Sequence, residues 1–544
     1  MLAFASAALA LAGPVAFAQE TEIDRLFADF ARPGVPGCSV AIVRDGRTIY
    51  RKSFGEANLE YAIPIREDTP FHIASVSKQF TAFSIFLLAR ERKLSLDDDI
   101  RKYLPELSYQ NNTVTIRHLI HHIGGIRDQW DLAVMAGWRM EDVITHHDLL
   151  GLLFRQTELN FTPGSAFMYS NGGYSLLAEI VARVSGTPFP AFCRTRIFEP
   201  LGMKNTRVFS DAHALVPGRA YSYRPGEGGW EKALLSYSNM GATSIFTTAD
   251  DLVLWDRNFE DPKVGGPAVR DWMLVRGVLT SGRTIEYAGG LLCFQYRGLE
   301  AVEHAGADAG FRSEYIRFPG QRLSIILLSN RATFAGPEVA RQIADILLAT
   351  EFSQPKPQPP TVPAAHKPVS DREFAEIVGD YKFETGRWIT VRRSGDHPVV
   401  RLDDGPEVNL VKTGESKYVV DRVGIGVEFV VAPGGGKSPK LVLETQRPMV
   451  AVREKLAWPT AAELARLAGT YVSDELGVRY EIVIQPDGGL LLRHPRDDFP
   501  LTLVLPDRFA SSLGRIAVER SKSGRVIGFR VTSDRAVGVR FRKE

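Results

Sequence analysis

The 544-residue sequence is poor in cysteine, with only Cys38, Cys193 and Cys293. An odd, scattered set fits neither a disulfide framework nor a zinc site, so we expect three small, buried, apolar side chains. The adjacent pairs His121–His122 and His146–His147 have no acidic or cysteine partner at ligand spacing, and neighbouring histidines point to different helix faces. The sequence therefore predicts a protein that needs neither a metal nor another cofactor.

The chain also lacks a strong charge of either sign. Its 66 Lys and Arg residues are balanced by 64 Asp and Glu, which gives a formal net charge of +2. Without a basic run, no nucleic acid is expected as a partner. No segment beyond the N-terminus approaches 18 consecutive apolar residues, so we expect no membrane span. The hydrophobic content of 44% is that of a globular protein with sizeable cores.

Residues 1–18 are small and apolar and end in Ala16-Phe17-Ala18, which is an A-x-A cleavage pattern. The positively charged start of an export signal is missing, which leaves the true start codon open. A signal peptide is nevertheless favoured over a buried first helix. The sequence thus predicts a periplasmic or secreted protein.

Residues 19–350 predict one domain of the α+β class. Segments 39–43 and 48–54 read as two strands joined through Asp45-Gly46, which is a hairpin signal. Strands are also expected near residues 291–296, 313–318 and 323–328. Helices are expected at 114–126, after the loop 161–174 up to Gly186, from a capping box at Thr248–Asp251, and near 338–348. Strands from both ends with helices between them predict one mixed sheet with a helical insert.

The C-terminal part, from residue 351, has a different residue pattern. Residues 351–370 are rich in proline and predict a semi-rigid linker. Beyond it, Phe374–Tyr381 is echoed by Leu464–Tyr471, which indicates two repeats. We expect two small antiparallel β-barrel domains, at residues 371–456 and 457–544. Pro433–Ser438 mimics the end of a phosphate-binding loop, but Val431 stands where that motif needs its first glycine, so we interpret it as a hairpin turn.

Ser75-Val76-Ser77-Lys78 leads into a long apolar run and predicts a turn that feeds a buried helix. A spacing of three places the hydroxyl and the amine on one face of the helix. A lysine in an apolar setting has a lowered pKa and can activate the neighbouring serine, and a helix N-terminus stabilises an oxyanion. Alone the motif is common, and a capped helix with an exposed lysine is the simpler interpretation.

Three motifs follow one another in the chain: Ser75-Val76-Ser77-Lys78, Tyr169-Ser170-Asn171 and His304-Ala305-Gly306. Together they resemble the serine-reactive penicillin-recognising hydrolases, which include class C β-lactamases, D,D-peptidases, D-aminopeptidases and related esterases. The resemblance covers about residues 20–350. It implies a β-lactamase-like domain in which helices and a helical subdomain flank an antiparallel sheet.

The resemblance also implies a role for each matching residue. Ser75 would be the acylated nucleophile, while Lys78 and Tyr169 would share the work of general base and proton relay. Which of the two takes the proton stays open. Asn171 would hold the acyl carbonyl or a side-chain amide of the substrate, and His304 and Gly306 would lie on the opposite wall. The N–H groups of Ser75 and Ala307 would form the oxyanion hole. Arg312 would bind a substrate carboxylate, or it would be a surface arginine without a role in binding. His118 and His122 match structural positions.

The chain departs from the family at His304, where β-lactamases and D,D-peptidases carry the lysine of Lys-Thr-Gly. An unperturbed histidine is mostly neutral at pH 7, so strong anchoring of a β-lactam carboxylate is not expected. A histidine at this place resembles the D-aminopeptidase and esterase branches. The segment Gly124–Trp130 and the two barrels resemble the D-aminopeptidase branch. Asp128 would then recognise a free amine or merely cap its loop. The barrels would restrict access to the cleft or act as spacers.

These features predict an exported serine hydrolase that acts through an acyl-enzyme on a small amide or ester, with D-amino-acid peptides or amides favoured. Its partner would be a small molecule or short peptide, and a homodimer is left open. The alternatives are an esterase of the same fold and a non-catalytic binding or scaffolding protein. An α/β-hydrolase is poorly supported, because Gly37-Cys38-Ser39-Val40-Ala41 lacks the last glycine of the nucleophile elbow.

Overall fold

The computed structural model describes residues 18–109, 112–356, 369–421, 423–430, 436–445 and 448–544. Nearly all of the predicted signal peptide, most of the linker and the first half of the Pro433–Ser438 turn lie outside these residues. The chain forms two compact units. One ends at Pro355 and also includes Arg535–Val537, and the other comprises the rest of the chain from Lys356.

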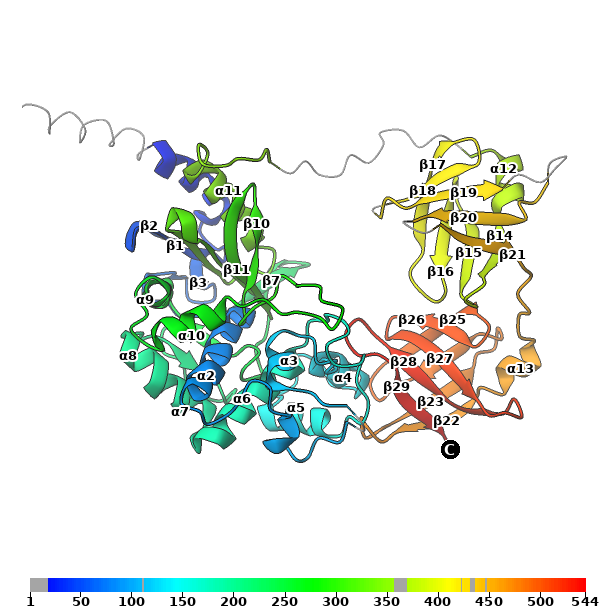
Figure 1. Ribbon diagram of the computed structural model, residues 1–544, viewed down its shortest axis with the longest axis horizontal. Helices are drawn as coiled ribbons and strands as arrows, with labels where there is room; N and C mark the ends of the chain where they lie inside the picture. The colour runs from blue at the N-terminus through cyan, green and yellow to red at the C-terminus, as the bar shows by residue number, and fades with distance from the viewer. Residues whose placement is uncertain (1–17, 110–111, 357–368, 422, 431–435, 446–447) are drawn as a thin grey trace, which may run out of the picture. The chain divides into compact units, whose positions relative to one another are not determined.

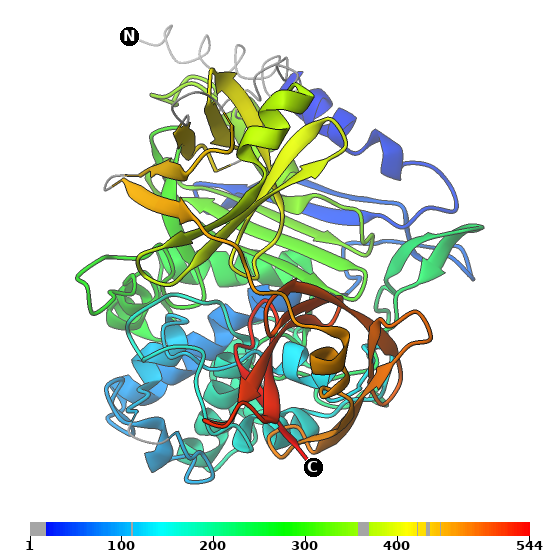
Figure 2. The same ribbon diagram turned by 90° about the vertical axis from the view of Figure 1, so that its right-hand side faces the viewer.

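The first unit is built on a six-stranded sheet in the order β10-β11-β12-β13-β1-β2. Every neighbouring pair is antiparallel, so the prediction of a mixed sheet is wrong and the antiparallel sheet that the resemblance implies is confirmed. Figures 1 and 2 show the N-terminal strands in blue beside strands from past residue 290 in green. The bounds are β1 Cys38–Arg44, β2 Arg47–Phe54, β10 Leu292–Tyr296, β11 Leu299–Asp308, β12 Phe311–Phe318 and β13 Leu323–Ser329.

The hairpin of β1 and β2 is confirmed. Asp45 and Gly46 have φ angles of 53° and 72°, which is the left-handed pair that a two-residue turn of this type requires. Strand β11, by contrast, was not predicted from its residue pattern. Its residues Glu303 to Asp308 mix charged, small and apolar side chains, so the alternation that marks a half-buried strand is missing.

Helices cover both faces of the sheet, which explains why β1 and β13 are buried almost throughout. On one face, the β1 residues Val40 and Ile42 lie opposite Leu327 and Ile325 of β13 and share a core with α11 (Gly336–Leu347) and residues 23–30. On the other face, α9 (Ala249–Glu260) packs against the same two strands. Burial on both faces favours the β-branched and leucine-rich strand sequences seen here.

The helical part surrounds α2 (Lys78–Arg90), which is buried over eleven of its residues. Helix α3 (Ile116–Ile120) is much shorter than the predicted helix at 114–126, because His122 and Gly125 adopt left-handed backbone angles. Helix α6 (Asn171–Ser185) ends at Gly186 as predicted. The other helices are α4 Gln129–Met135, α5 His146–Phe154, α7 Phe189–Cys193, α8 Glu199–Leu201 and α10 Gly266–Met273.

Only half of the predicted capping box at Thr248 forms. The Thr248 hydroxyl accepts from the backbone N–H of Asp251 at 3.1 Å. The Asp251 carboxylate does not return to Thr248 and accepts instead from Asn205 and Thr206. Short strands complete this unit: β3 Glu56–Asn58, β4 Ile63–Pro64, β5 Phe71–His72, β6 Arg207–Val208, β7 Tyr223–Gly226, β8 Gly229–Lys232 and β9 Ile245–Thr247.

The second unit contains two closed antiparallel barrels of eight strands each, which confirms the expected fold class. A short helix precedes each barrel, α12 (Asp371–Ile377) and α13 (Ala461–Ala465), and each has a capping box. The repeat extends to single contacts, since the hydroxyl of Tyr381 donates to Ile377 O and that of Tyr471 to Leu467 O. The strands are β14 Gly379–Phe383, β15 Trp388–Ser394, β16 His397–Leu402, β17 Val408–Gly414, β18 Lys417–Val420, β19 Gly426–Val430, β20 Lys440–Glu444 and β21 Met449–Arg453, then β22 Gly469–Ser473, β23 Val478–Ile484, β24 Leu490–Arg493, β25 Asp498–Leu505, β26 Arg508–Ser511, β27 Gly514–Arg520, β28 Val526–Thr532 and β29 Val539–Lys543.

The three cysteines carry free thiols. Cys38 and Cys193 are buried as predicted, whereas Cys293 on β10 is partly exposed. In the described part of the chain, no helix combines the length and the apolar character needed to cross a bilayer.

One buried carboxyl group gives a stability prediction. Glu314 on β12 is fully buried beneath α11, and neither of its carboxylate oxygens has a hydrogen-bond partner among the described residues. Burial, reinforced by the nearby Glu303 carboxylate, raises the pKa of Glu314 well above its usual range. The folded chain therefore keeps a proton that the unfolded chain releases above about pH 4.3, and stability falls as pH rises through the window between the two pKa values.

We expect Glu314→Gln to raise the Tm by about 3 °C at pH 8 and to change it little at pH 4. Thermal unfolding followed across this pH range measures the effect. Glu227→Gln, an exposed acid between β7 and β8, serves as the control and should leave the profile unchanged. Parallel pH profiles for wild type and Glu314→Gln would contradict the prediction.

Candidate active site

The serine and lysine of the first motif lie together at the start of α2. Ser75 lies in a 3-10 turn (η2, Ala74–Ser77), and Lys78 is the first residue of α2. The prediction that both residues lie in the first turn of one regular helix is therefore wrong. The spacing nevertheless places Lys78 Nζ 3.1 Å from Ser75 Oγ. Ala74, directly before the serine, has a φ of 47°, which is a strained angle for a non-glycine residue.

Strands β11 and β12 hold this strained turn. Gly306 of β11 packs so closely that a Cβ there would lie 2.4 Å from Ile73 O and 2.2 Å from Ser313 Oγ. The Ser313 hydroxyl in turn donates to Ile73 O at 2.7 Å. Gly306 therefore acts through close backbone approach, and no side chain could replace its hydrogen without moving the nucleophile turn.

Lys78 is fully buried, and its Nζ has three oxygen neighbours. Asn171 Oδ1 and Ala242 O both lie at 2.8 Å, and Ser75 Oγ lies at 3.1 Å. Burial lowers the pKa of Lys78 to about 7, although the negative charge of Asp128 acts in the opposite direction. The first two oxygens can only accept, so a neutral amine gives them its two N–H bonds and turns its lone pair to Ser75. This arrangement suits a general base.

Tyr169 lies over the lysine, with its ring centroid 4.8 Å from Lys78 Nζ. Burial raises the pKa of Tyr169 well above its usual value, and a hydrogen bond with Ser75 only partly offsets this. The phenol therefore stays protonated at neutral pH and is better suited to relay a proton than to act as the base. His122 supports it from behind, with ring centroids 4.3 Å apart, while its own Nδ1 accepts from Ser170 N.

Asp128 fixes the orientation of Asn171. Its Oδ2 accepts from both the backbone N and the Nδ2 of Asn171 at 2.9 Å, which leaves Asn171 Oδ1 pointing to Lys78. Its Oδ1 accepts from Trp130 N and caps α4. Asp128 is fully buried. The structure thus places it as a cap, one of the two roles weighed from sequence, and adds a contact that the sequence did not reveal.

His304 of β11 lies behind the cleft. Its Nδ1 donates to Ala305 O at 2.6 Å, so its Nε2 accepts from the Tyr287 hydroxyl at 3.0 Å. Burial, followed by the charge of Lys78, lowers the pKa of His304 to about 3, which keeps the ring neutral. The side chain is 4% exposed and is absent from the lining of the cleft, unlike the wall position expected from the resemblance. Sequence reasoning missed Tyr287 entirely.

The cleft in front of the nucleophile brings together five of the eight predicted site residues: Ser75, Tyr169, Asn171, Ala307 and Arg312. The other three, Lys78, His304 and Gly306, support them from behind. Arg312 uses one guanidinium nitrogen on Ala309 O and Phe311 O of its own turn. Trp130 and Tyr237 add aromatic surface to the cleft.

His118 and His121 have local partners. His118 accepts from Thr115 N and completes the capping box of α3, and both ring nitrogens of His121 lie near backbone carbonyls. Within the described residues, no three or more His, Cys, Asp or Glu side chains are grouped to hold a metal ion.

Comparisons with known proteins agree with this geometry. A D-aminopeptidase from Brucella anthropi is 26% identical over 534 residues, which cover 93% of this chain and 95% of that protein. Penicillin-binding protein 4* from Bacillus subtilis is 28% identical over 421 residues, which cover 74% of this chain and 91% of that protein. The solved D-amino acid amidase from Ochrobactrum anthropi SV3, 24% identical, shares the fold with a TM-score of 0.52 over 61% of this chain and 98% of its own.

The family comparison identifies the chain itself. The Beta-lactamase family matches residues 23–350, which is more than half of the sequence and includes every predicted site residue. With relatives that are D-aminopeptidases over nearly the full length, the enzyme class is a serine hydrolase of this fold. The protein is a member of the Beta-lactamase family.

Proposed function

We propose that this serine hydrolase is exported and cleaves amides or short peptides of D-amino acids through an acyl-enzyme on Ser75. The observation that carries the proposal is the position of Lys78 Nζ, which has two acceptor-only neighbours and Ser75 Oγ as its third. The D-amino acid preference is supported by the D-aminopeptidase relatives, one of which spans 93% of this chain including the barrels.

The geometry supports a two-step reaction. Ser75 Oγ attacks the substrate carbonyl while its proton passes to Lys78 Nζ, and the N–H groups of Ser75 and Ala307 stabilise the oxyanion. The C–N bond then breaks, and the leaving amine takes a proton relayed through the Tyr169 hydroxyl. Water attacks the resulting ester, gives its proton to the same base and releases the carboxylic acid and free Ser75. Asn171 holds the lysine throughout.

The wall formed by β11 offers no fixed positive charge at residue 304, because the pKa of His304 is lowered by burial to about 3. A β-lactam carboxylate therefore loses the anchor that a lysine would give it. We expect the enzyme to turn over amides of D-amino acids much faster than a cephalosporin. An ester, which needs less leaving-group assistance, is the second substrate class to compare.

Initial rates on four substrates test the proposed function: D-alanine p-nitroanilide, its L-isomer, a p-nitrophenyl acyl ester and a chromogenic cephalosporin. The proposal expects Ser75-dependent cleavage of the D-anilide in preference to its L-isomer, with no activity in Ser75→Ala. Ester turnover with both anilides untouched would make the enzyme an esterase instead.

Export is tested separately. Expressed with its own N-terminus in a Gram-negative host, the protein should appear in the periplasm or the medium and begin at Gln19, after Ala16-Phe17-Ala18. An uncleaved protein retained in the cytoplasm would contradict this part of the proposal.

A further inference from the structure

A second hollow adjoins the active-site cleft. It has a volume of about 260 Å³ and shares Ala233 and Leu234 with the lining of the cleft, so a substrate that reaches past Leu234 enters it directly. This volume suits the end of a short peptide rather than a folded partner. Its other lining residues are Val143, Ala212, His213, Arg219, Ala220, Tyr221, Ser222, Lys232, Leu235, Ser236 and Phe311.

The hollow has an apolar rim that faces solvent. Val143 is 58% exposed, Leu234 is 50% exposed and Tyr221 is 39% exposed. Exposed apolar side chains grouped beside a catalytic cleft indicate a surface that a ligand covers.

Arg219 gives the hollow its charge. Its guanidinium lies over three aromatic rings, with centroid distances of 5.2 Å to Tyr221, 5.5 Å to Phe246 and 5.7 Å to Phe209. The rings fix the position of the cation but leave its N–H donors without a carboxylate, since no described acidic group lies within ion-pair distance of it. The other cation in the hollow, Lys232, is paired with Glu60, and the ring of His213 lies 3.0 Å from Asp211.

The charge of Arg219 also reaches the catalytic side of the fold. Burial lowers the pKa of His72 to about 4, and the Arg219 charge adds to that lowering. His72 lies three residues before Ser75, and its ring packs against Phe246 and against Phe311, which lines the hollow. Phe246, over which the Arg219 guanidinium lies, thus also contacts a residue three positions before the nucleophile.

We propose that this hollow is a distal subsite that binds the C-terminal carboxylate of a peptide substrate. The inference rests on the proposed function. The acyl group of an aminopeptidase is a single residue that stays at Ser75, so the part of the substrate that extends past Leu234 is the leaving peptide. A carboxylate gives Arg219 the charge-assisted hydrogen bonds it lacks, whereas a neutral amide leaves them unmade.

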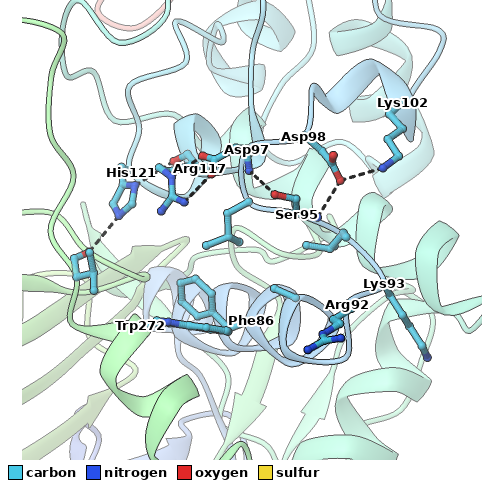
Figure 3. Close-up of a pocket in the computed structure, with 14 residues that line it drawn as sticks. Phe86, Arg92, Lys93, Ser95, Asp97, Asp98, Lys102, Arg117, His121 and Trp272 are labelled. Atoms are coloured by element: carbon cyan, nitrogen blue, oxygen red, sulfur yellow. Dashed lines mark hydrogen bonds and ion pairs between the residues drawn. The ribbon is translucent and has the colours of Figure 1, made fainter.

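A third hollow, shown in Figure 3, does not adjoin the cleft. Phe86 and Trp272 form one of its walls, and His121 and Arg117 lie opposite. Its cations Arg117 and Lys102 are paired with Asp97 and Asp98, and it shares no lining residue with the cleft. It does supply a control: Arg92 is exposed there and, within the described chain, has no acidic partner.

The test uses full-length enzyme and peptides of the form D-alanyl-(glycyl)n, with n from one to four, each as the free acid and as the C-terminal amide. We expect wild type to prefer the acid at one chain length by about tenfold in kcat/KM, the size of one charge-assisted hydrogen bond. Arg219→Gln should remove this preference, Arg219→Lys should keep part of it, and Arg92→Gln should keep all of it.

D-alanine p-nitroanilide has no carboxylate and reports on the catalytic centre alone. Unchanged turnover of this anilide by Arg219→Gln, together with loss of the acid preference, supports the subsite. Anilide turnover without any acid preference in wild type overturns the subsite but leaves the proposed function standing. An acid preference that survives in Arg219→Gln also overturns it, and absence of all D-alanyl cleavage overturns both.

Discussion

Replacing Lys78 with methionine is expected to lower kcat/KM on D-alanine p-nitroanilide by about a thousandfold, because the base that takes the Ser75 proton is lost. Methionine has a similar length and tolerates a fully apolar setting, so the fold should survive. Steady-state kinetics and thermal unfolding of the purified variant measure the two effects separately. Lys78→Arg is the matched charged variant and should be equally inactive, because a guanidinium keeps its proton.

The pH dependence gives a second readout for the same residue. Since the pKa of Lys78 in the folded chain is lowered to about 7, wild-type kcat/KM should rise with pH through about 7 as the amine becomes neutral. An unfolded lysine keeps its proton up to about pH 10.4, so this group destabilises the fold most at and below pH 7 and less as pH rises towards 10.4. Lys78→Met should therefore be at least as stable as wild type at pH 7. Full activity in Lys78→Met would assign the base to another residue.

Asp128→Asn is expected to lower kcat by about a hundredfold with a small change in KM, because the catalytic groups shift by a fraction of an ångström. An asparagine at 128 cannot accept on both sides, so its amide nitrogen must face either Asn171 or Trp130 N, and the amide must turn its nitrogen to Asn171 to keep the cap of α4. The amide of Asn171 then loses the partner that turns its Oδ1 to Lys78. We regard Asp128 as a positioning residue that acts through Asn171.

A purely structural role for Asp128 would not move the pH profile, whereas this account predicts a shift. The Asp128 charge raises the pKa of Lys78 against the larger lowering by burial, so its removal should move the rising limb of kcat/KM to lower pH. Asp99→Asn is a matched control, because Asp99 also caps a helical turn, η3 (Ile100–Lys102), but its carboxylate accepts from Arg101 and not from Asn171. An unshifted limb in Asp128→Asn would contradict the positioning role.

Local patterns explain what could be predicted from the sequence. The β1–β2 hairpin follows from two adjacent residues, and the approach of Lys78 to Ser75 follows from a spacing of three. The end of α6 at Gly186 depends on a single glycine. Each of these features is decided within a few residues, where propensity and spacing act directly.

Long-range contacts explain what could not be predicted. Asp128 and Asn171 are 43 residues apart, and Tyr287 and His304 come from a loop and a strand whose pairing no spacing rule gives. The early end of α3 follows from the left-handed angle of His122, which is uncommon for residues other than glycine and which no local pattern predicts. The free charge of Arg219 depends on the absence of an acidic neighbour among the residues that the structure describes, which the sequence does not show.

The central claim is that Ser75 forms a covalent acyl-enzyme with Lys78 as its base. Intact-mass and peptide mass spectrometry after a short incubation with a slowly hydrolysed p-nitrophenyl ester or a penicillin-type probe tests it most directly. The account predicts one acyl group per chain, on the peptide that contains Ser75, and none on Ser75→Ala. Acylation of another residue, or unchanged labelling of Ser75→Ala, would contradict it.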